Sequence, residues 1–240
     1  MGERCFTATK APTCARQFAT PPPPHHHITD QVQALTIENT SSLSMSGIPP
    51  SNALYPIYEV TLTAEMGVYL KSMDPQAEAR SELIVAMSDC SPAEVVGFVH
   101  YLPLRGSADA CGVTYIAVAQ HARRQGVARA LMDEVRKAYP HIGLSCPIEK
   151  VEIFEKLGLQ VVGANHNHVE MNTDEEPTPG AIGVLDVEPL FHSPEVLDLQ
   201  AKLVMKHKRS GLKQAQQELA RLYHRDCSRV ASFVQDRKAT

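Results

Sequence analysis

Residues 118–132 read VAQHARRQGVARALM, and this stretch decides the fold. An apolar, strand-like run leads into it, and a helix-like run follows the two arginines and the glycine at its centre. A tight turn from a strand into a helix leaves unpaired backbone N–H groups at the helix start, where the helix dipole adds positive potential. Such a junction attracts an anion. We therefore predict that this stretch holds a pyrophosphate.

Individual residues of the stretch suit this role. Gly126 lets a ligand approach the backbone closely, and Ala128 keeps a second position small. Arg123 and Arg124 add positive charge, and Arg129 lies just inside the helix. The stretch has neither the Gly-Lys-Ser/Thr sequence of a P-loop nor a three-glycine dinucleotide pattern.

Periodicity around this stretch predicts a mixed α/β layer architecture across residues 54–172. The predicted order is β-α-β-β-β-α-β-α-β-β. Strands are expected over 54–63, 81–90, 93–104, 111–119 and 141–146, with two more around an Asn-rich turn in 159–172; helices are expected over 63–73, 127–139 and 148–158.

The flanking segments differ in composition. Residues 1–53 are rich in proline and serine and contain a Pro-His tract, so we expect a flexible segment. Residues 173–192 are acidic and proline-bearing, which indicates a linker. Residues 193–240 show two helical patterns separated at Gly211 and carry more basic than acidic side chains, which predicts a basic helical hairpin. Its apolar positions suit packing: Val196, Leu199, Leu203, Leu212, Leu219 and Leu222.

Charge and composition exclude several classes of function. The net charge of −4 and the pI near 6.3 give no general attraction to nucleic acid or to an anionic membrane. No apolar run is long enough for a membrane span. The six cysteines lack metal or disulfide spacing, so we read them as thiols in a reducing cytoplasm and expect no metal.

The central stretch resembles a known family, the GCN5-related N-acetyltransferases (GNAT family). Residues 123–128, RRQGVA, match the family signature Gln/Arg-x-x-Gly-x-Gly/Ala. The flanks strengthen the match, because YIAVAQHARRQGVARALMDEV resembles the family's fourth strand, acyl-CoA loop and third helix. VEIFEKLGLQVVGA resembles a helix-to-strand segment further along the family's chain. The likeness covers residues 81–172 and implies a GNAT-like mixed central sheet with flanking helices.

The resemblance implies that acetyl-CoA binds as acyl donor where the fourth and fifth strands splay apart. Main-chain groups of Ile116, Ala117 and Val118 would pair with the pantetheine arm. The amide at Val118 would stabilise the oxyanion of the tetrahedral intermediate. The pyrophosphate would lie on the loop and helix start formed by Arg123, Arg124, Gln125, Gly126, Val127 and Ala128.

The usual catalytic residues of the family are absent. A frequent Tyr acid aligns with Phe154, a frequent Asn with Pro147, and a Glu found in some members with Gly112. Cys146 is the catalytic candidate, because it ends the fifth strand and could protonate the leaving thiolate; a buried strand residue is the alternative.

Other polar residues near the expected cleft have open roles. Thr114 and Tyr115 lie on the fourth strand, where we expect Tyr115 to be a core residue on one face of the sheet. His100 either shares the buried face of the third strand or lines a pocket. The segment 165–168, NHNH, is expected to form a hairpin turn, with substrate contact as the alternative.

The predicted function is transfer of an acetyl group from acetyl-CoA to an amine, on a small molecule or a protein, by direct attack in a ternary complex. One alternative is a regulatory module that binds acetyl-CoA with weakened catalysis. Another is an acetyltransferase whose basic C-terminal helices recruit a nucleic-acid- or partner-linked amine. For those helices we favour packing or homodimerisation over nucleic-acid binding, and we expect no membrane partner.

Overall fold

A computed structural model of the chain describes residues 14–18, 26–73, 80–89, 92–175, 182–183 and 185–238. Within these ranges there are seven strands: β1 (Cys14–Phe18), β2 (Glu82–Met87), β3 (Val95–Pro103), β4 (Ala110–Val118), β5 (His141–Cys146), β6 (Gln160–Asn165) and β7 (His168–Asn172). The α-helices are α1 (His26–Glu38), α2 (Thr40–Leu43), α3 (Tyr55–Lys71), α4 (Val127–Ala138), α5 (Val151–Lys156) and α6 (Pro194–Lys238). Three short 3-10 helices are η1 (Gln120–Ala122), η2 (Ile148–Lys150) and η3 (Glu188–His192).

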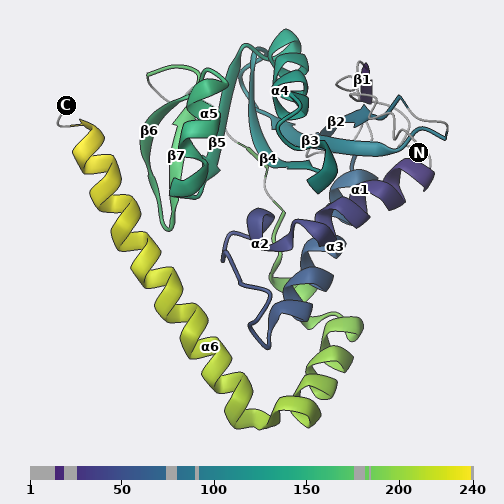
Figure 1. The fold of residues 1–240 in the computed structure, drawn as a ribbon, viewed down its shortest axis with the longest axis vertical. Coiled ribbons are helices and arrows are strands. Elements are labelled where there is room, and N and C mark those ends of the chain that lie inside the picture. Colours follow the sequence, from purple (N-terminus) through teal and green to yellow (C-terminus); the bar gives the residue numbers. More distant parts are fainter. Residues whose placement is uncertain are drawn as a thin grey trace, which may run out of the picture.

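The strands form one sheet in the order β1-β2-β3-β4-β5-β7-β6. All neighbours are antiparallel except β4 and β5, which run parallel and are connected through α4. Helices cover both faces, with α4 on one face and α1 and α3 on the other (Figure 1). The predicted α/β class and the strand and helix pattern from residue 81 to 172 are confirmed.

Alternate residues of β3 show how the two faces are filled. A Cβ at Gly97 would lie 2.9 Å from a methyl of Val127 and 3.4 Å from one of Leu131, so this face packs tightly on α4. His100 faces the opposite way, with its ring centroid 4.6 Å from that of Tyr69 on α3. The sheet is therefore a buried central layer, which agrees with the almost continuous burial along β3.

The strand predicted over residues 54–63 is wrong, because these residues belong to the start of α3. Val60, Thr61 and Thr63 favour strands by propensity. In the helix, however, the hydroxyls of Thr61 and Thr63 donate to the carbonyls one turn earlier, at 2.8 and 2.7 Å. Burial of one helical face then outweighs propensity; this face contains Ile57, Thr61, Leu62, Met66, Tyr69 and Leu70.

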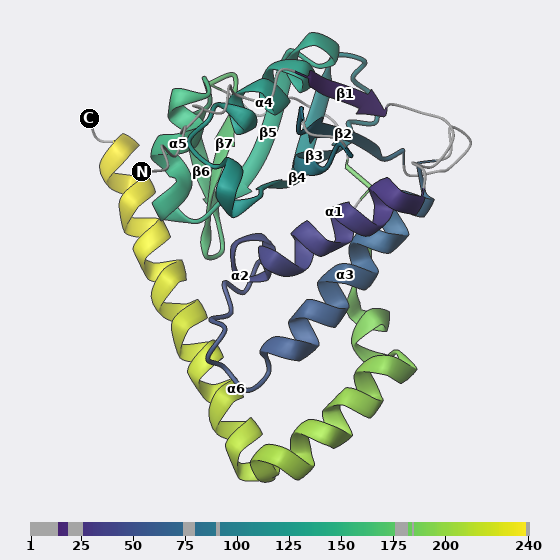
Figure 2. The ribbon, with the colours of Figure 1, turned by 45° about the vertical axis from the view of Figure 1, so that its right-hand side comes forward.

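Over residues 26–53 the structure also differs from the predicted flexible segment. Ile28, Val32 and Leu35 recur at helical spacing and are buried in the main core, so α1 is an integral part of the fold. Helix α1 lies beside α3 in Figure 2. The proline run lies outside the described residues, whereas His26 and His27 begin α1 and are exposed to solvent.

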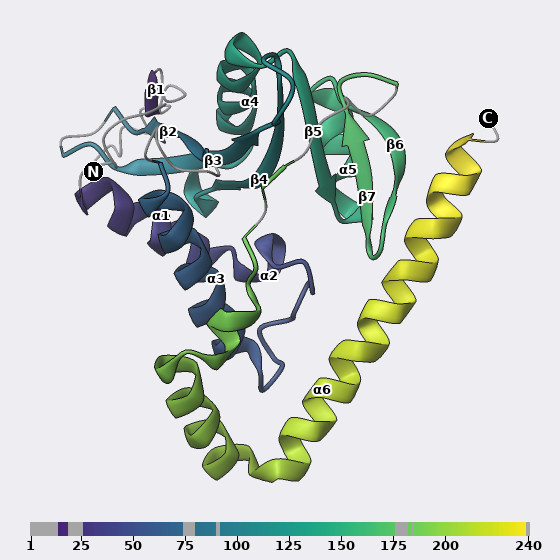
Figure 3. The ribbon, with the colours of Figure 1, turned by 180° about the vertical axis from the view of Figure 1, so that it is seen from behind.

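The two helical patterns predicted from residue 193 onward are present, but they do not form a hairpin. Both belong to α6, which bends at Lys208 (φ 60°, ψ 162°) and not at Gly211. The arms diverge in a V (Figure 3) because they pack on different surfaces. Val196 and Leu203 cluster with Ile57 of α3, whereas Val230 and Val234 join the main core.

The second arm of α6 also holds surface elements together. The buried amide of Asn52 donates to the carbonyl of Ala215 at 3.0 Å. Arg229 pairs with Glu149 at 3.0 Å and Arg237 with Glu155 at 2.7 Å. The arm thereby connects the loop before α3 to the region around α5. None of the helices in the described ranges is long and apolar enough to cross a membrane.

Candidate active site

The strands β4 and β5 separate part-way along their length. Their parallel pairing joins residues 110–113 to residues 141–144 only. Beyond this point β4 continues to Val118 beside β3, whereas β5 continues to Cys146 beside β7. The edge of β4 that faces β5 is thus unpaired by β5 over residues 114–118. This is the splay that the family resemblance implies, and Ile116, Ala117 and Val118 lie along it.

The turn that follows β4 presents the N-terminus of α4. Gly126 is the N-cap residue, with φ 84°, and no side chain caps the helix there. Arg124 also has a positive φ of 62°. A Cβ at Gly126 would meet nothing within 4 Å, so the space above this glycine is open. Since the first amides of a helix have no intrahelical partner, the amides that begin α4 are suited to an anion.

The polar side chains of this turn are mostly bonded to the protein itself. Arg123 donates to the Val118 carbonyl at 3.1 Å and to Asn39 Oδ1 at 2.8 Å. Gln125 donates to the His121 carbonyl at 2.8 Å, and Arg129 to the Lys156 carbonyl at 2.7 Å. Arg123 therefore fixes the shape of the loop against β4 and the end of α1, and the backbone amides and the exposed Arg124 side chain are left for an anion.

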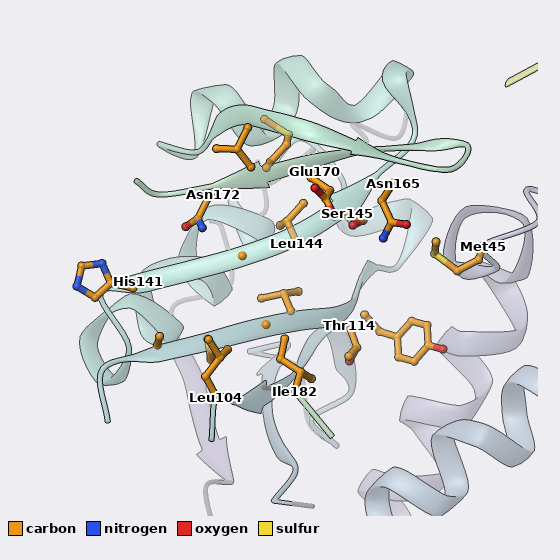
Figure 4. Close-up of a pocket in the computed structure, with 18 of the residues that line it drawn as sticks. Met45, Leu104, Thr114, His141, Leu144, Ser145, Asn165, Glu170, Asn172 and Ile182 are labelled. Carbon is orange, nitrogen blue, oxygen red and sulfur yellow. The ribbon is translucent and has the colours of Figure 1, made fainter. Parts of the chain in front are cut away.

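A cavity of about 580 Å³ opens on the sheet face opposite α4. Its walls come from β4, β5 and β7, with Glu65 and Tyr69 of α3 and Met45 of the loop after α2. Figure 4 shows Thr114, Ser145, Asn165 and Glu170 around it. The cavity includes residues 112–115 of β4 and 143–145 of β5, where the two strands part.

One carboxylate in this cavity has an altered acidity. Burial raises the pKa of Glu65 above its ordinary value, although the hydrogen bond from Tyr115 opposes that rise. The pKa of Tyr115 is strongly raised, first by burial and then by the nearby Glu65 charge, so its hydroxyl keeps its proton and donates to Glu65. A carboxylate with a raised pKa in a cavity is suited to act as a general base.

The segment predicted as a linker contributes to the same cavity. Ile182 and Leu185 line it, and the Leu185 amide donates to the Tyr69 hydroxyl at 3.3 Å. A Cβ at Gly112 would lie 2.3 Å from Ile182 Cδ1. A glutamate at this position, which the resemblance expects in some members, would therefore displace Ile182.

Cys146 does not line the cavity. Its side chain is buried in the main core, and its thiol contacts Met171 Sδ at 3.6 Å. Burial raises its pKa to about 12, so the thiol is protonated at neutral pH. Phe154 is likewise buried in the main core. The position of Cys146 corresponds to the buried alternative considered for it.

His100 also takes the buried alternative. It is fully enclosed, and burial lowers its pKa to about 3, so the ring is neutral at neutral pH. Its two nitrogens bond to Ser81 Oγ (2.6 Å) and to Thr114 Oγ1. His100 is thus connected to the cavity wall by its hydrogen bond to Thr114, which lines the cavity.

The NHNH segment forms the predicted hairpin turn between β6 and β7. Asn165 lines the cavity, and Asn167 donates to the Met45 carbonyl at 2.7 Å. No cluster of three His, Cys, Asp or Glu side chains suited to a metal ion occurs among the residues that the structure describes.

Glu65, Tyr69, Ser145 and Glu170 were not expected from the sequence. They lie on three different elements and carry no local motif, since only tertiary packing brings them to one cavity. A signal existed for Glu65 alone, because it interrupts the apolar pattern of residues 63–73.

The acetyltransferase (GNAT) domain family matches residues 79–161. No curated protein sequence matches the chain significantly. Among solved structures, a nourseothricin acetyltransferase is 22% identical with a TM-score of 0.34, over 38% of this chain and 64% of that one, less than two thirds of its length.

Two other structures match more of this chain. An aminoglycoside 6'-acetyltransferase type Ii is 18% identical with a TM-score of 0.48, over 69% of this chain and 99% of that one. The PaiA N-acetyltransferase of Thermoplasma acidophilum in complex with coenzyme A is 12% identical with a TM-score of 0.49, over 67% and 99%. Since these scores are below 0.5, the identification depends on the family match. The family match therefore assigns residues 79–161 of the chain to an acetyltransferase (GNAT) domain.

Proposed function

We propose that the protein transfers the acetyl group of acetyl-CoA to an amine bound in the cavity beside β4 and β5, by direct attack in a ternary complex. The observation that carries this proposal is the position of the cavity, at the residues where β4 and β5 part. The pyrophosphate of acetyl-CoA would bind the amides of residues 124–128, and its pantetheine arm would lie along residues 116–118. The thioester would then reach the cavity.

Glu65 is the proposed general base. An amine is protonated at neutral pH and must lose a proton before its nitrogen can attack the thioester carbon. The raised pKa of Glu65 brings this carboxylate closer to the acidity that proton transfer near neutral pH requires. The amide at Val118 is the proposed donor to the oxyanion, which then collapses and expels the CoA thiolate.

The leaving thiolate would be protonated by solvent. A thiol with an ordinary pKa near roughly 8.5 is a fair leaving group without help from an acid. The burial of Cys146 and Phe154 away from the cavity supports this assignment.

The experiment that tests the proposal is release of CoA thiol over a panel of amines by wild type and Glu65→Gln. We expect kcat to fall by about 10² to 10⁴-fold, the usual contribution of general base catalysis, with the Kd for acetyl-CoA unchanged. Glu59→Gln is the matched control, because Glu59 lies on the same helix and does not line the cavity. A Glu65→Gln enzyme with wild-type kcat would rule out Glu65 as the base.

The second candidate function is a regulatory module that binds acetyl-CoA without efficient catalysis. It is favoured by Pro147 and Phe154, which replace an Asn and a Tyr that the family frequently uses. Acetyl-CoA binding without turnover on any amine of the panel would establish this second function and contradict the first.

Further features of the protein are also proposals. We infer that the acceptor is a small-molecule or protein amine and that the enzyme works in the cytoplasm. Homodimerisation through α6 is supported by the exposed apolar side chains of Leu197 and Met205, the latter 79% exposed. Molar mass by light scattering, with Met205→Ser as the variant, tests the dimer.

A further inference from the structure

A buried chain of hydrogen bonds runs from α3 to the cavity wall. Ser81 Oγ donates to the carbonyl of Tyr69 at 3.1 Å and contacts His100 Nε2 at 2.6 Å. The other ring nitrogen of His100 bonds to Thr114 Oγ1, which also lies 3.1 Å from the His100 carbonyl. Ser81 and His100 are fully buried, whereas Thr114 lines the cavity.

The number of protons in this chain determines what Thr114 offers to a ligand. If the neutral ring carries its proton on Nε2, that proton goes to Ser81, and Thr114 donates to Nδ1. If the proton is on Nδ1, it goes to Thr114, which then donates to the His100 carbonyl, and the Ser81 hydroxyl donates to Nε2 in place of the Tyr69 carbonyl. In both tautomers the single hydroxyl proton of Thr114 points into the protein. The oxygen of Thr114 is therefore left as a hydrogen-bond acceptor toward the cavity.

A β-bulge gives Thr114 this orientation. The pairing of β3 with β4 shifts register between His100 and Tyr101, which face Tyr115 and Val113 respectively. Thr114 is the extra residue, so two consecutive side chains, Thr114 and Tyr115, both reach the cavity. Because Tyr115 donates its own proton to Glu65, neither hydroxyl of this pair on β4 has a free proton for a ligand.

We propose that Thr114 positions the attacking nitrogen by accepting a hydrogen bond from it, with Ser81 and His100 as positioning residues behind it. This inference rests on the proposed function of the cavity. A neutral primary amine has two N–H groups and a lone pair, so it can bond to Thr114 and to the Glu65 side while its lone pair faces the thioester. A secondary amine has a second alkyl group in place of one N–H group, so it can make only one of these two hydrogen bonds.

The test uses methylamine and dimethylamine as acceptors at saturating acetyl-CoA, because both are small enough for the cavity and differ by one N–H. For wild type we expect kcat/KM to favour methylamine by about tenfold or more, the usual effect of one hydrogen bond to a charged or reacting group. Thr114→Val keeps the shape and removes the acceptor, so the ratio should fall toward one. Thr114→Ser should restore it.

Acetyl-CoA affinity and unfolding by urea serve as controls for folding of each variant. Ser81→Ala, which leaves Thr114 in place, should lower the methylamine preference partially, because the ring of His100 loses its anchor. Turnover of both amines with a ratio that Thr114→Val leaves unchanged would overturn this inference and leave the proposed function intact. Failure to acetylate these two amines and every other amine of the panel, with acetyl-CoA bound, would contradict the proposed function and this inference together.

Discussion

Gly126→Asp should abolish acetyl-CoA binding. The substitution adds a negative charge to the N-cap of α4, at a position where the space above the backbone is open. If that space holds the pyrophosphate, two unit charges about 4 Å apart repel each other by about 4 kcal/mol at an effective dielectric constant of about 20. The Kd for acetyl-CoA would then rise by about a thousandfold.

The assay is calorimetric titration with acetyl-CoA, supported by thermal unfolding. Ligand at about a hundred times Kd should stabilise wild type by about 2.7 kcal/mol and leave the variant unchanged. Gly106→Asp is the matched control, because Gly106 also has a positive φ (90°) and a Cβ there would meet no atom within 4 Å, but it lies in the turn between β3 and β4. If Gly126→Asp binds acetyl-CoA within threefold of the Gly106→Asp affinity, the pyrophosphate does not lie at this loop.

Three further outcomes can be measured. Leu35→Ala should lower the free energy of unfolding in urea by about 2–5 kcal/mol, because the Leu35 side chain is only 6% exposed. Ile37→Ala, on the same helix but 44% exposed, should change it by less than about 0.5 kcal/mol. Equal effects of the two substitutions would show that α1 does not pack on the core. The unfolded chain binds a proton at His100 below pH about 6.5, whereas the folded protein does so only near a pKa of about 3, so acid favours unfolding. Between about pH 7 and pH 5 the free energy of unfolding of wild type should therefore fall by about 2 kcal/mol more than that of His100→Gln. An equal fall in the two proteins would contradict the buried neutral ring. Cys146→Ala should keep kcat within about threefold of the wild-type value, since the thiol lies in the core away from the cavity. A fall in kcat of about a hundredfold with unchanged acetyl-CoA affinity would show that Cys146 takes part in catalysis.

Local sequence was sufficient for the part of the fold in which neighbouring residues decide the geometry. The loop at residues 123–128 is defined by a strand, a glycine with positive φ and a helix start, all within one stretch of chain. The hairpin of β6 and β7 is equally local. The start of helix α3 differs from its predicted strand because its threonines and valines favour a strand, and only tertiary burial of one face, which includes the contact of Ile57 with α6, selects the helix.

The residues of the cavity could not be predicted from local sequence, because only tertiary packing brings them together. Glu65 and Tyr115 are fifty residues apart in sequence, and their hydrogen bond exists only once α3 is packed on the sheet. Thr114 was named from its strand, but its orientation depends on a bulge that propensity does not reveal. Helix α1 could have been found, since Ile28, Val32 and Leu35 have helical spacing beneath a polar composition.

The packing of α6 has a consequence for the order of events during synthesis. Val230 and Val234 complete the same core as the sheet, yet they leave the ribosome roughly sixty residues after β7. At a translation rate of about 5–20 residues per second, the sheet waits roughly 3 to 12 s with that apolar surface uncovered. The nascent domain is thus a candidate client for chaperones during this interval, and its maturation is timed by translation of α6.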